Sequence, residues 1–184
     1  MKHISNLLFE AKILKEIPRS GYHFLGSGRE SVAEHSFMIS FIAFVMARME
    51  PGIDAMKLVG MCLVHDLPES RTGDLNYVQK KYVHADEKKA VADLVRNLPF
   101  GDAIRDLIEE FNEGKTREAR LAKDADQLSF ILELKTLSDT GRKGPEDWLP
   151  IVTARLTTDT GKRIAESIAE TSWDEWWKKN YVEG

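Results

Sequence analysis

The sequence is poor in cysteine and proline and has no long uninterrupted apolar run. Its 184 residues include one cysteine and six prolines. The single cysteine, Cys62, excludes an internal disulfide and any cysteine-rich zinc site, and its apolar neighbours are typical of a small buried side chain. No segment approaches the roughly 20 consecutive apolar residues of a membrane span, and the first residues lack the apolar core of a signal peptide. We therefore expect a cytoplasmic protein without a membrane partner.

Basic residues are outnumbered by acidic ones. Lysine and arginine total 26 against 30 aspartates and glutamates, which gives a formal net charge of −4. A chain with this balance has no overall positive field to attract a nucleic-acid polymer or an anionic membrane. An anionic small-molecule substrate would therefore have to be held by local groups.

Alternating apolar and polar runs, which mark β-strands, are also missing. Apolar residues instead recur every three or four positions, which predicts an all-α protein, and the length suits one domain over residues 1–184. The capping-box pattern that joins Ser31 to Glu34 opens one expected helix, and that from Ser172 to Glu175 opens the last. Further helices are expected over about residues 3–16, 54–66, 78–97, 101–112, 117–138, 146–156 and 159–170. Loops are expected at 18–28, 70–75 and 140–145.

The adjacent pair His65 and Asp66 closes an apolar helical run and is the most informative feature of the chain. Two buried polar groups of this kind need partners, because each costs several kcal/mol when left unpaired. His35 lies upstream and Asp126 downstream, each inside its own helical pattern. His35 alone would be typical of a hydrogen-bonded helical histidine, but the joint order over three helices indicates a mononuclear metal site.

Two imidazoles and two carboxylates make a mixed nitrogen and oxygen donor set. Such a set suits Mn²⁺, Co²⁺, Fe²⁺, Ni²⁺ or Zn²⁺ rather than Ca²⁺, and it leaves positions open for water and a phosphate oxygen. Glu69 follows His65 by four residues and would share its face if helical geometry continues past Pro68. On spacing alone, Glu69 is more typical of a solvated residue at a helix end than of a catalytic one, and Asp74 is typical of a turn former.

Several segments together resemble the HD-domain phosphohydrolases, and most of all their 5′-deoxynucleotidase branch. The segments are 30–36 (ESVAEHS), 63–69 (LVHDLPE), 72–74 (TGD), 113–116 (EGKT) and 123–128 (KDADQL). The resemblance covers residues from about 4 to 138. It implies an HD-type helical bundle with a metal site in its core, which hydrolyses deoxynucleoside 5′-monophosphates and forms a homodimer.

The resemblance also implies roles for individual residues. One divalent metal would be bound by His35, His65, Asp66 and Asp126, where it would activate a water molecule and polarise the phosphoryl group. Glu69 would assist proton transfer, Asp74 would position the sugar or the attacking water, and Arg19 would hold the phosphate. The aromatic residue that often follows the arginine loop is Tyr22 here, so we assign Tyr22 to the substrate-binding loop and leave sugar discrimination open.

Helical periodicity and the resemblance disagree about the last ligand. Relative to the stripe of Leu121, Ala125 and Leu128, Asp124 sits nearer the apolar face than Asp126 does. The family spacing, Asp-x-Leu, selects Asp126, and we follow the family.

Other interpretations remain open. The protein is alternatively an HD hydrolase of another nucleotide, such as a cyclic dinucleotide, a deoxynucleoside triphosphate or a guanosine polyphosphate, or a non-catalytic helical interaction module. A di-iron oxygenase would need more histidines, and His3, His23 and His84 lack ligand spacing.

The region beyond about residue 140 lies outside the resemblance. It is expected to be a helical extension over about 146–181 that caps the bundle or contributes to a dimer. Within it, Trp173, Trp176, Trp177 and Tyr181 form an aromatic cluster. Packing of the last helix onto its own core is favoured over a dimer or partner surface.

Overall fold

The computed structural model describes residues 1–182, and these form helices joined by loops, with no β-strand among them. The α-helices are α1 (Lys2–Ile13), α2 (Val32–Met49), α3 (Ala55–Val64), α4 (Glu69–Thr72), α5 (Glu87–Val95), α6 (Gly101–Glu113), α7 (Arg117–Asp139), α8 (Pro145–Thr153), α9 (Asp159–Glu170) and α10 (Glu175–Tyr181). Two short 3₁₀-helices, η1 (Ser20–Phe24) and η2 (Gln79–Lys81), lie in loops. The predicted all-α class is confirmed.

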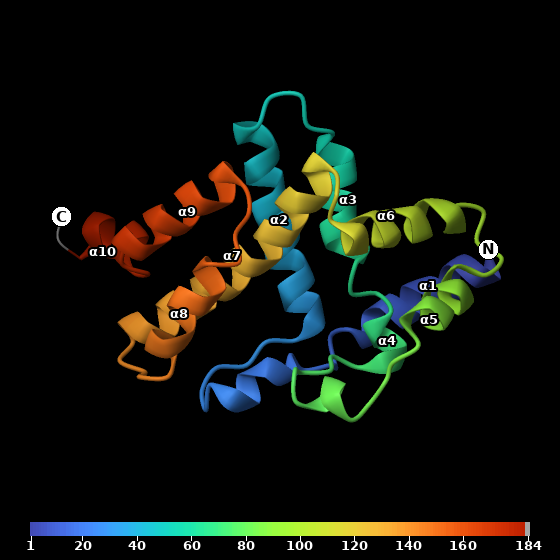
Figure 1. Ribbon diagram of the computed structural model, residues 1–184, viewed down its shortest axis with the longest axis horizontal. Coiled ribbons are helices and arrows are strands. Elements are labelled where there is room, and N and C mark those ends of the chain that lie inside the picture. The colour runs from blue at the N-terminus through green and yellow to red at the C-terminus, as the bar shows by residue number, and fades with distance from the viewer. Residues whose placement is uncertain (183–184) are drawn as a thin grey trace.

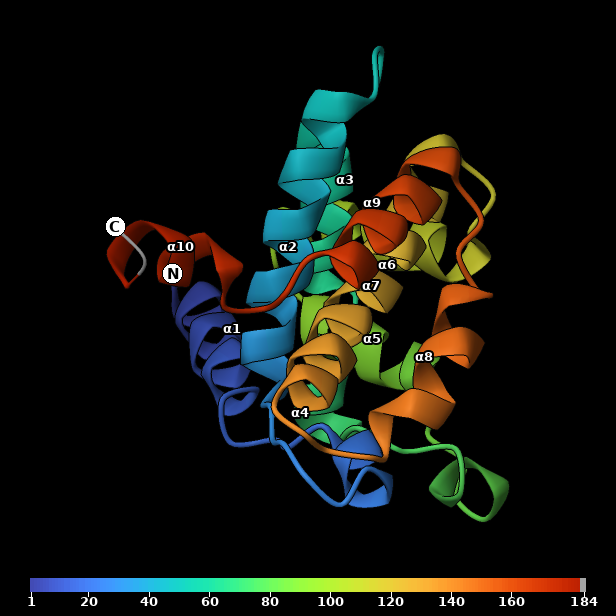
Figure 2. The same cartoon turned by 90° about the vertical axis from the view of Figure 1, so that its left-hand side faces the viewer.

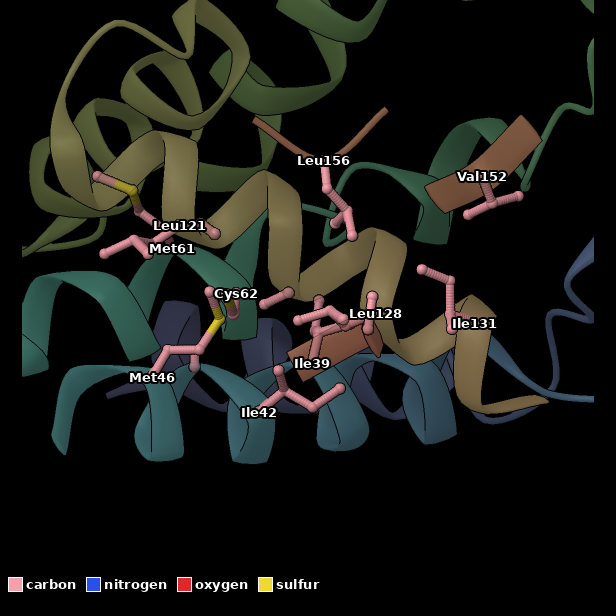
Figure 3. Close-up of a cluster of buried hydrophobic side chains, with 14 of the residues drawn as sticks. Ile39, Ile42, Met46, Met61, Cys62, Leu121, Leu128, Ile131, Val152 and Leu156 are labelled. Carbon is pink, nitrogen blue, oxygen red and sulfur yellow. The ribbon is translucent and has the colours of Figure 1, made fainter. Parts of the chain in front are cut away.

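Helices α2, α3 and α7 form the centre of the molecule and pack against one another. In Figure 1, α2 and α7 cross near the middle, with α8 and α9 on the left and α1, α5 and α6 on the right. Figure 3 shows the cluster of buried apolar side chains where these central helices meet, to which Ile39, Cys62 and Leu128 contribute. Val152 of α8 extends the same cluster. The core therefore holds three central helices in fixed relative positions.

Helix α2 combines an apolar composition with a well-defined start. Ser31 Oγ accepts a hydrogen bond from Glu34 N at 3.2 Å, and Glu34 Oε2 accepts one from Ser31 N at 2.7 Å, so the predicted capping box is present. Among residues 1–182, α2 is the one helix whose length and composition would suit a membrane span. Its buried stripe, however, packs against α3 and α7, which is the environment of a core helix.

One predicted helix and one predicted loop differ from the structure in physically informative ways. The helix expected over 78–97 is divided into η2 and α5, separated by extended chain, and α5 begins at the N-cap Asp86. Nearly every side chain in 77–87 is exposed, so no tertiary packing supports a helix there. The expected loop at 70–75 begins as helix, because α4 continues to Thr72.

The C-terminal helix also departs from expectation. Asp174, not Ser172, is its N-cap, and Ser172 Oγ donates a hydrogen bond to Asp174 Oδ1 at 2.7 Å. Helix α10 has no buried residue, and Trp176 and Tyr181 are 73% and 79% exposed. The expectation that this aromatic cluster packs onto the protein's own core is therefore wrong, because the helix lies on the surface.

The surroundings of Asp124 explain why helical periodicity placed it nearer the apolar face than Asp126. Its buried carboxylate accepts hydrogen bonds from the backbone N–H and the hydroxyl of both Thr157 and Thr158, at distances of 2.6 to 3.2 Å. Thr158 is the N-cap of α9, and a Cβ on Gly161 would collide with the same carboxylate. Asp124 thus joins α7 to the start of α9, which is a structural role.

Candidate metal centre

The first histidine is placed by the capping box. Because Ser31 caps α2, His35 falls in the first turn of that helix, where it is almost completely buried. Its Nε2 atom lies 2.9 Å from Oδ1 of Asp126 on α7 and 3.9 Å from Oδ2 of Asp66. The start of α2 thus brings an imidazole beside two carboxylates from other elements.

The second histidine and its neighbouring aspartate lie where α3 ends. His65 is the C-cap residue, and its Nδ1 is 3.0 Å from the backbone oxygen of Cys62. A carbonyl oxygen only accepts, so Nδ1 carries the proton and the lone pair of Nε2 is free for a ligand. That Nε2 lies 3.1 Å from Oδ1 of Asp66. Binding of a metal through Nε2 requires this tautomer.

The geometry brings together the residues that the sequence singled out. Ligand atoms of His35, His65 and Asp126 all lie within 4.8 Å of one another, which is close enough to hold one metal ion. Asp66 lies beside this group through its contacts with both histidines. Asp124, two residues before Asp126, faces away toward α9.

The residues present fit a divalent cation. Oδ2 of Asp66 and Nε2 of His35 are both buried without a hydrogen-bond partner. The 2.9 Å approach of His35 to Asp126 therefore lacks hydrogen-bond geometry. Buried atoms of this kind are costly unless something satisfies them, and a cation would satisfy all of them at once. Mixed imidazole and carboxylate donors suit a transition metal.

The charges of the cluster support one another. Burial opposes ionisation of Asp126, but nearby His35, His65 and Arg19 outweigh it and hold its pKa below the ordinary value. Burial likewise disfavours protonated His65, yet Asp66 and Asp126 raise its pKa overall. The site therefore favours ionised carboxylates beside a protonated His65, and a bound metal would replace that proton as the compensating positive charge.

Glu69 lies next to this cluster without belonging to it. It is the first residue of α4, and its buried Oε2 has no hydrogen-bond partner. Burial, reinforced by the negative charges of Asp66 and Asp74, raises the pKa of Glu69 to about 9. A carboxyl group in this position is suited to proton transfer.

Arg19 and Asp74 connect two loops at the edge of the cluster. Arg19 Nη1 lies 3.6 Å from Asp66 Oδ2, and its Nε lies 4.0 Å from Asp74 Oδ2. The same oxygen of Asp74 accepts a hydrogen bond from Ser20 N at 2.8 Å. Asp74 therefore holds the loop that carries Arg19, which is more than the turn-forming role that its spacing suggested.

Tyr22 occupies a core position. Its side chain is buried, packs edge-on against Phe130 and lies against Gly28, and its hydroxyl donates to Glu30 Oε2 at 3.4 Å. The assignment of Tyr22 to substrate binding stays a prediction: the side chain is mostly buried, and it lines a cavity of about 310 Å³ together with Arg19 and Glu30.

Glu30 is a residue to which the sequence assigned no role. Its Oε2 lies 3.7 Å from Nδ1 of His35 and 4.0 Å from Nε of Arg19. Burial raises the pKa of this carboxyl group, although His35 and Arg19 oppose the effect. Its position five residues before His35, at the end of the arginine loop, was the available signal.

Comparison with known proteins agrees with this geometry. The HD domain family matches residues 11–172, which is most of the chain. The chain belongs to the HD domain family. This HD domain also resembles a solved structure, a conserved hypothetical protein from Pyrococcus furiosus, with a TM-score of 0.73 and 29% identity over 90% of this chain and 99% of that one.

Curated relatives add names. The chain is 34% identical over 145 residues to 5′-deoxynucleotidase HDDC2 of Dictyostelium discoideum, over 71% of this chain and 76% of the relative. It is 28% identical to 5′-deoxynucleotidase HDDC2 of Homo sapiens, over 71% of this chain and 66% of that relative. The family match continues to residue 172, so part of the predicted C-terminal extension belongs to the HD domain itself.

The choice between the two aspartates of α7 is testable. We expect Asp126→Ala to lose bound metal, because it removes a donor atom, whereas Asp124→Ala keeps about one metal per chain. Asp124→Ala should instead lower the free energy of unfolding by about 3 kcal/mol, because it leaves buried donors unsatisfied. Elemental analysis and urea unfolding measure the two effects, with Asp124→Asn as the milder variant. Metal lost from the Asp124 variants and retained by Asp126→Ala would reverse the assignment.

Proposed function

We propose that this HD domain hydrolyses deoxynucleoside 5′-monophosphates to a deoxynucleoside and phosphate. The chain is a metal-dependent hydrolase of the HD family, and relatives named 5′-deoxynucleotidase support the finer assignment. The observation that carries it is the position of Arg19, whose guanidinium lies between Asp66 at the metal cluster and Asp74. A fixed cation there can bind a phosphate that reaches the metal.

The proposed ligands are His35, His65, Asp66 and Asp126, which would hold one divalent transition metal. When bound, the metal supplies a Lewis acid that activates water and polarises the phosphoryl group. Arg19 binds non-bridging phosphate oxygens and neutralises their charge. Asp74 orients the Arg19 loop by accepting a hydrogen bond from Ser20 N, and we assign it to positioning the sugar or the attacking water.

Proton movement is assigned to Glu69. In the reaction a water molecule loses a proton as its oxygen forms a bond to phosphorus, the bond from phosphorus to the 5′-oxygen breaks, and that oxygen gains a proton. The Oε2 atom of Glu69 is buried, unpartnered and adjacent to the cluster, so it is placed to accept one proton and release another.

A homodimer is the proposed assembly, and α2 offers the surface for it. Phe37, Phe41 and Phe44 are 68%, 54% and 46% exposed and follow one another along the helix, with successive ring centroids 6.5 Å apart. A contiguous exposed apolar stripe of this kind is typical of an interaction site. The cytoplasmic location remains a prediction.

The role of Glu69 predicts a separation of binding from turnover. Glu69→Ala should keep metal content but lose about 10²- to 10⁴-fold in kcat, because a positioned acid-base group is removed. Elemental analysis and phosphate release on the same preparation give both quantities. A variant within a few-fold of wild type would make Glu69 a structural residue.

Substrate preference tests the proposed function itself. Deoxynucleoside 5′-monophosphates should be hydrolysed faster than ribonucleotides, by about tenfold to a hundredfold, since a 2′-hydroxyl needs both space and a partner. The 3′-monophosphates should be poor substrates, because Arg19 and Asp74 fix where the phosphate attaches. A panel of nucleotides with phosphate detection measures this. Equal rates on deoxy and ribo substrates would contradict the proposed sugar preference, and absence of release with metal bound would contradict the phosphohydrolase.

The dimer has its own test. Phe41→Asp should shift the protein from dimer to monomer in analytical ultracentrifugation, because it places a charge in the middle of the apolar stripe. The exposed, distant Met56→Asp serves as a control that should leave the dimer intact. A wild-type protein that is monomeric at micromolar concentration would contradict the assembly.

A further inference from the structure

A row of aromatic side chains runs from the core to the surface beside the arginine loop. Phe130 of α7 lies 6.4 Å from Trp148 of α8, Trp148 lies 6.3 Å from Tyr77, and Tyr77 lies 4.9 Å from Phe24, measured between ring centroids. Phe24 and Tyr77 are 41% and 53% exposed. We call Phe24, Tyr77 and Trp148 the aromatic shelf. It is built from three separate segments, so no single helix explains it.

The aromatic shelf adjoins the candidate metal centre. Phe130 follows Asp126 by one helical turn and therefore shares its face of α7. Tyr77 follows Asp74 by three residues, and the hydrogen bond from Ser20 to Asp74 holds that segment against the start of η1. In Figures 1 and 2 the short helices η1 (blue, residues 20–24) and η2 (green, residues 79–81) lie at the lower end of the molecule, and α8 lies above them.

Two features distinguish the exposed part of the shelf from ordinary core packing. Phe24 ends η1 and Tyr77 lies in the turn before η2, and both of these rings remain partly exposed, unlike that of Tyr22. Phe24 packs against Tyr77, and Tyr77 in turn lies beside Trp148, so the exposed surfaces of Phe24 and Tyr77 are next to one another. A flat aromatic ligand could cover them at little conformational cost, because the rings already lie together.

We propose that the aromatic shelf binds the nucleobase of the substrate by stacking. This rests on the proposed function, in which Arg19 holds the phosphate and Asp74 positions the sugar or the attacking water. The base of a 5′-nucleotide is attached to the sugar away from the phosphate, and Tyr77 of the shelf follows Asp74 by three residues, on the segment that Ser20 holds against η1. Stacking on aromatic rings tolerates every base, since each base has a π-face. The site therefore selects for a nucleotide over a simple sugar phosphate without selecting one base.

The test compares a substrate that has a base with one that lacks it. For 2′-deoxyadenosine 5′-monophosphate, Tyr77→Ala should raise KM about 5- to 100-fold with kcat little changed, which is the loss expected for one stacked ring. For 2-deoxyribose 5-phosphate, KM should be the same in the variant and in wild type. Tyr77→Phe should restore the wild-type KM, because it keeps the ring. Tyr82→Ala, at a site 83% exposed in the same segment, is the matched control.

A second measurement does not depend on turnover of a nucleotide. Deoxyadenosine should inhibit hydrolysis of 2-deoxyribose 5-phosphate competitively in wild type and at least fivefold more weakly in Tyr77→Ala. Wild type should prefer the nucleotide to 2-deoxyribose 5-phosphate. If it does but Tyr77→Ala leaves the KM values for both substrates unchanged, or raises both equally, base stacking on the shelf is contradicted while the proposed function stands. If wild type cleaves no nucleotide, the proposed function fails, and calorimetric titration of wild type and Tyr77→Ala with deoxyadenosine decides the shelf alone. Equal binding by the two proteins overturns it.

Discussion

The constraint that governs this molecule is the concentration of negative charge in its interior. Asp66, Asp126, Glu69, Asp74 and Glu30 gather around a single guanidinium, that of Arg19, and two imidazoles. Buried carboxylates repel one another and are costly to desolvate unless cations or donors compensate them. Arg19 meets part of this demand, and the cluster of His35, His65 and Asp126 offers the rest to a metal. Binding chemistry and fold stability therefore depend on the same compensation.

The side chains of the candidate metal centre come from the ends of helices as well as from a helix face. His35 comes from the first turn of α2 and His65 from the C-cap position directly after α3, whereas Asp126 comes from the middle of α7. The chain changes direction at the end of a helix. Side chains at the ends of two helices and in the middle of a third can therefore approach the same point from different sides. The apolar cluster of the same three helices keeps their relative positions fixed (Figure 3). The packing of the apolar core therefore fixes the positions of the candidate metal ligands relative to one another.

Short-range sequence patterns correctly predicted the features that depend on neighbouring residues alone. The capping box at Ser31 and the helix over 117–138 follow from short-range signals, and the structure contains both. Periodicity correctly placed Asp124 inside the protein but could not show that its partners are Thr157 and Thr158, more than 30 residues away. The segment 78–86 has helical spacing but no surface to pack on, and the burial of Tyr22 depends on Phe130 from a distant helix. Such outcomes are set by tertiary contacts, which spacing does not encode.

The hydrogen bonds to Asp124 bear on where this fold can be cut. The recognisable motifs end near residue 138, which makes the last quarter of the chain look like an appendage. Yet the donors that satisfy Asp124 belong to that quarter, and Asp124 stands two residues from Asp126. A fragment that ended near residue 138 would lack these donors and would leave the carboxylate of Asp124 exposed and without partners. The functional unit therefore extends beyond the last recognisable motif and includes the threonines that donate hydrogen bonds to Asp124.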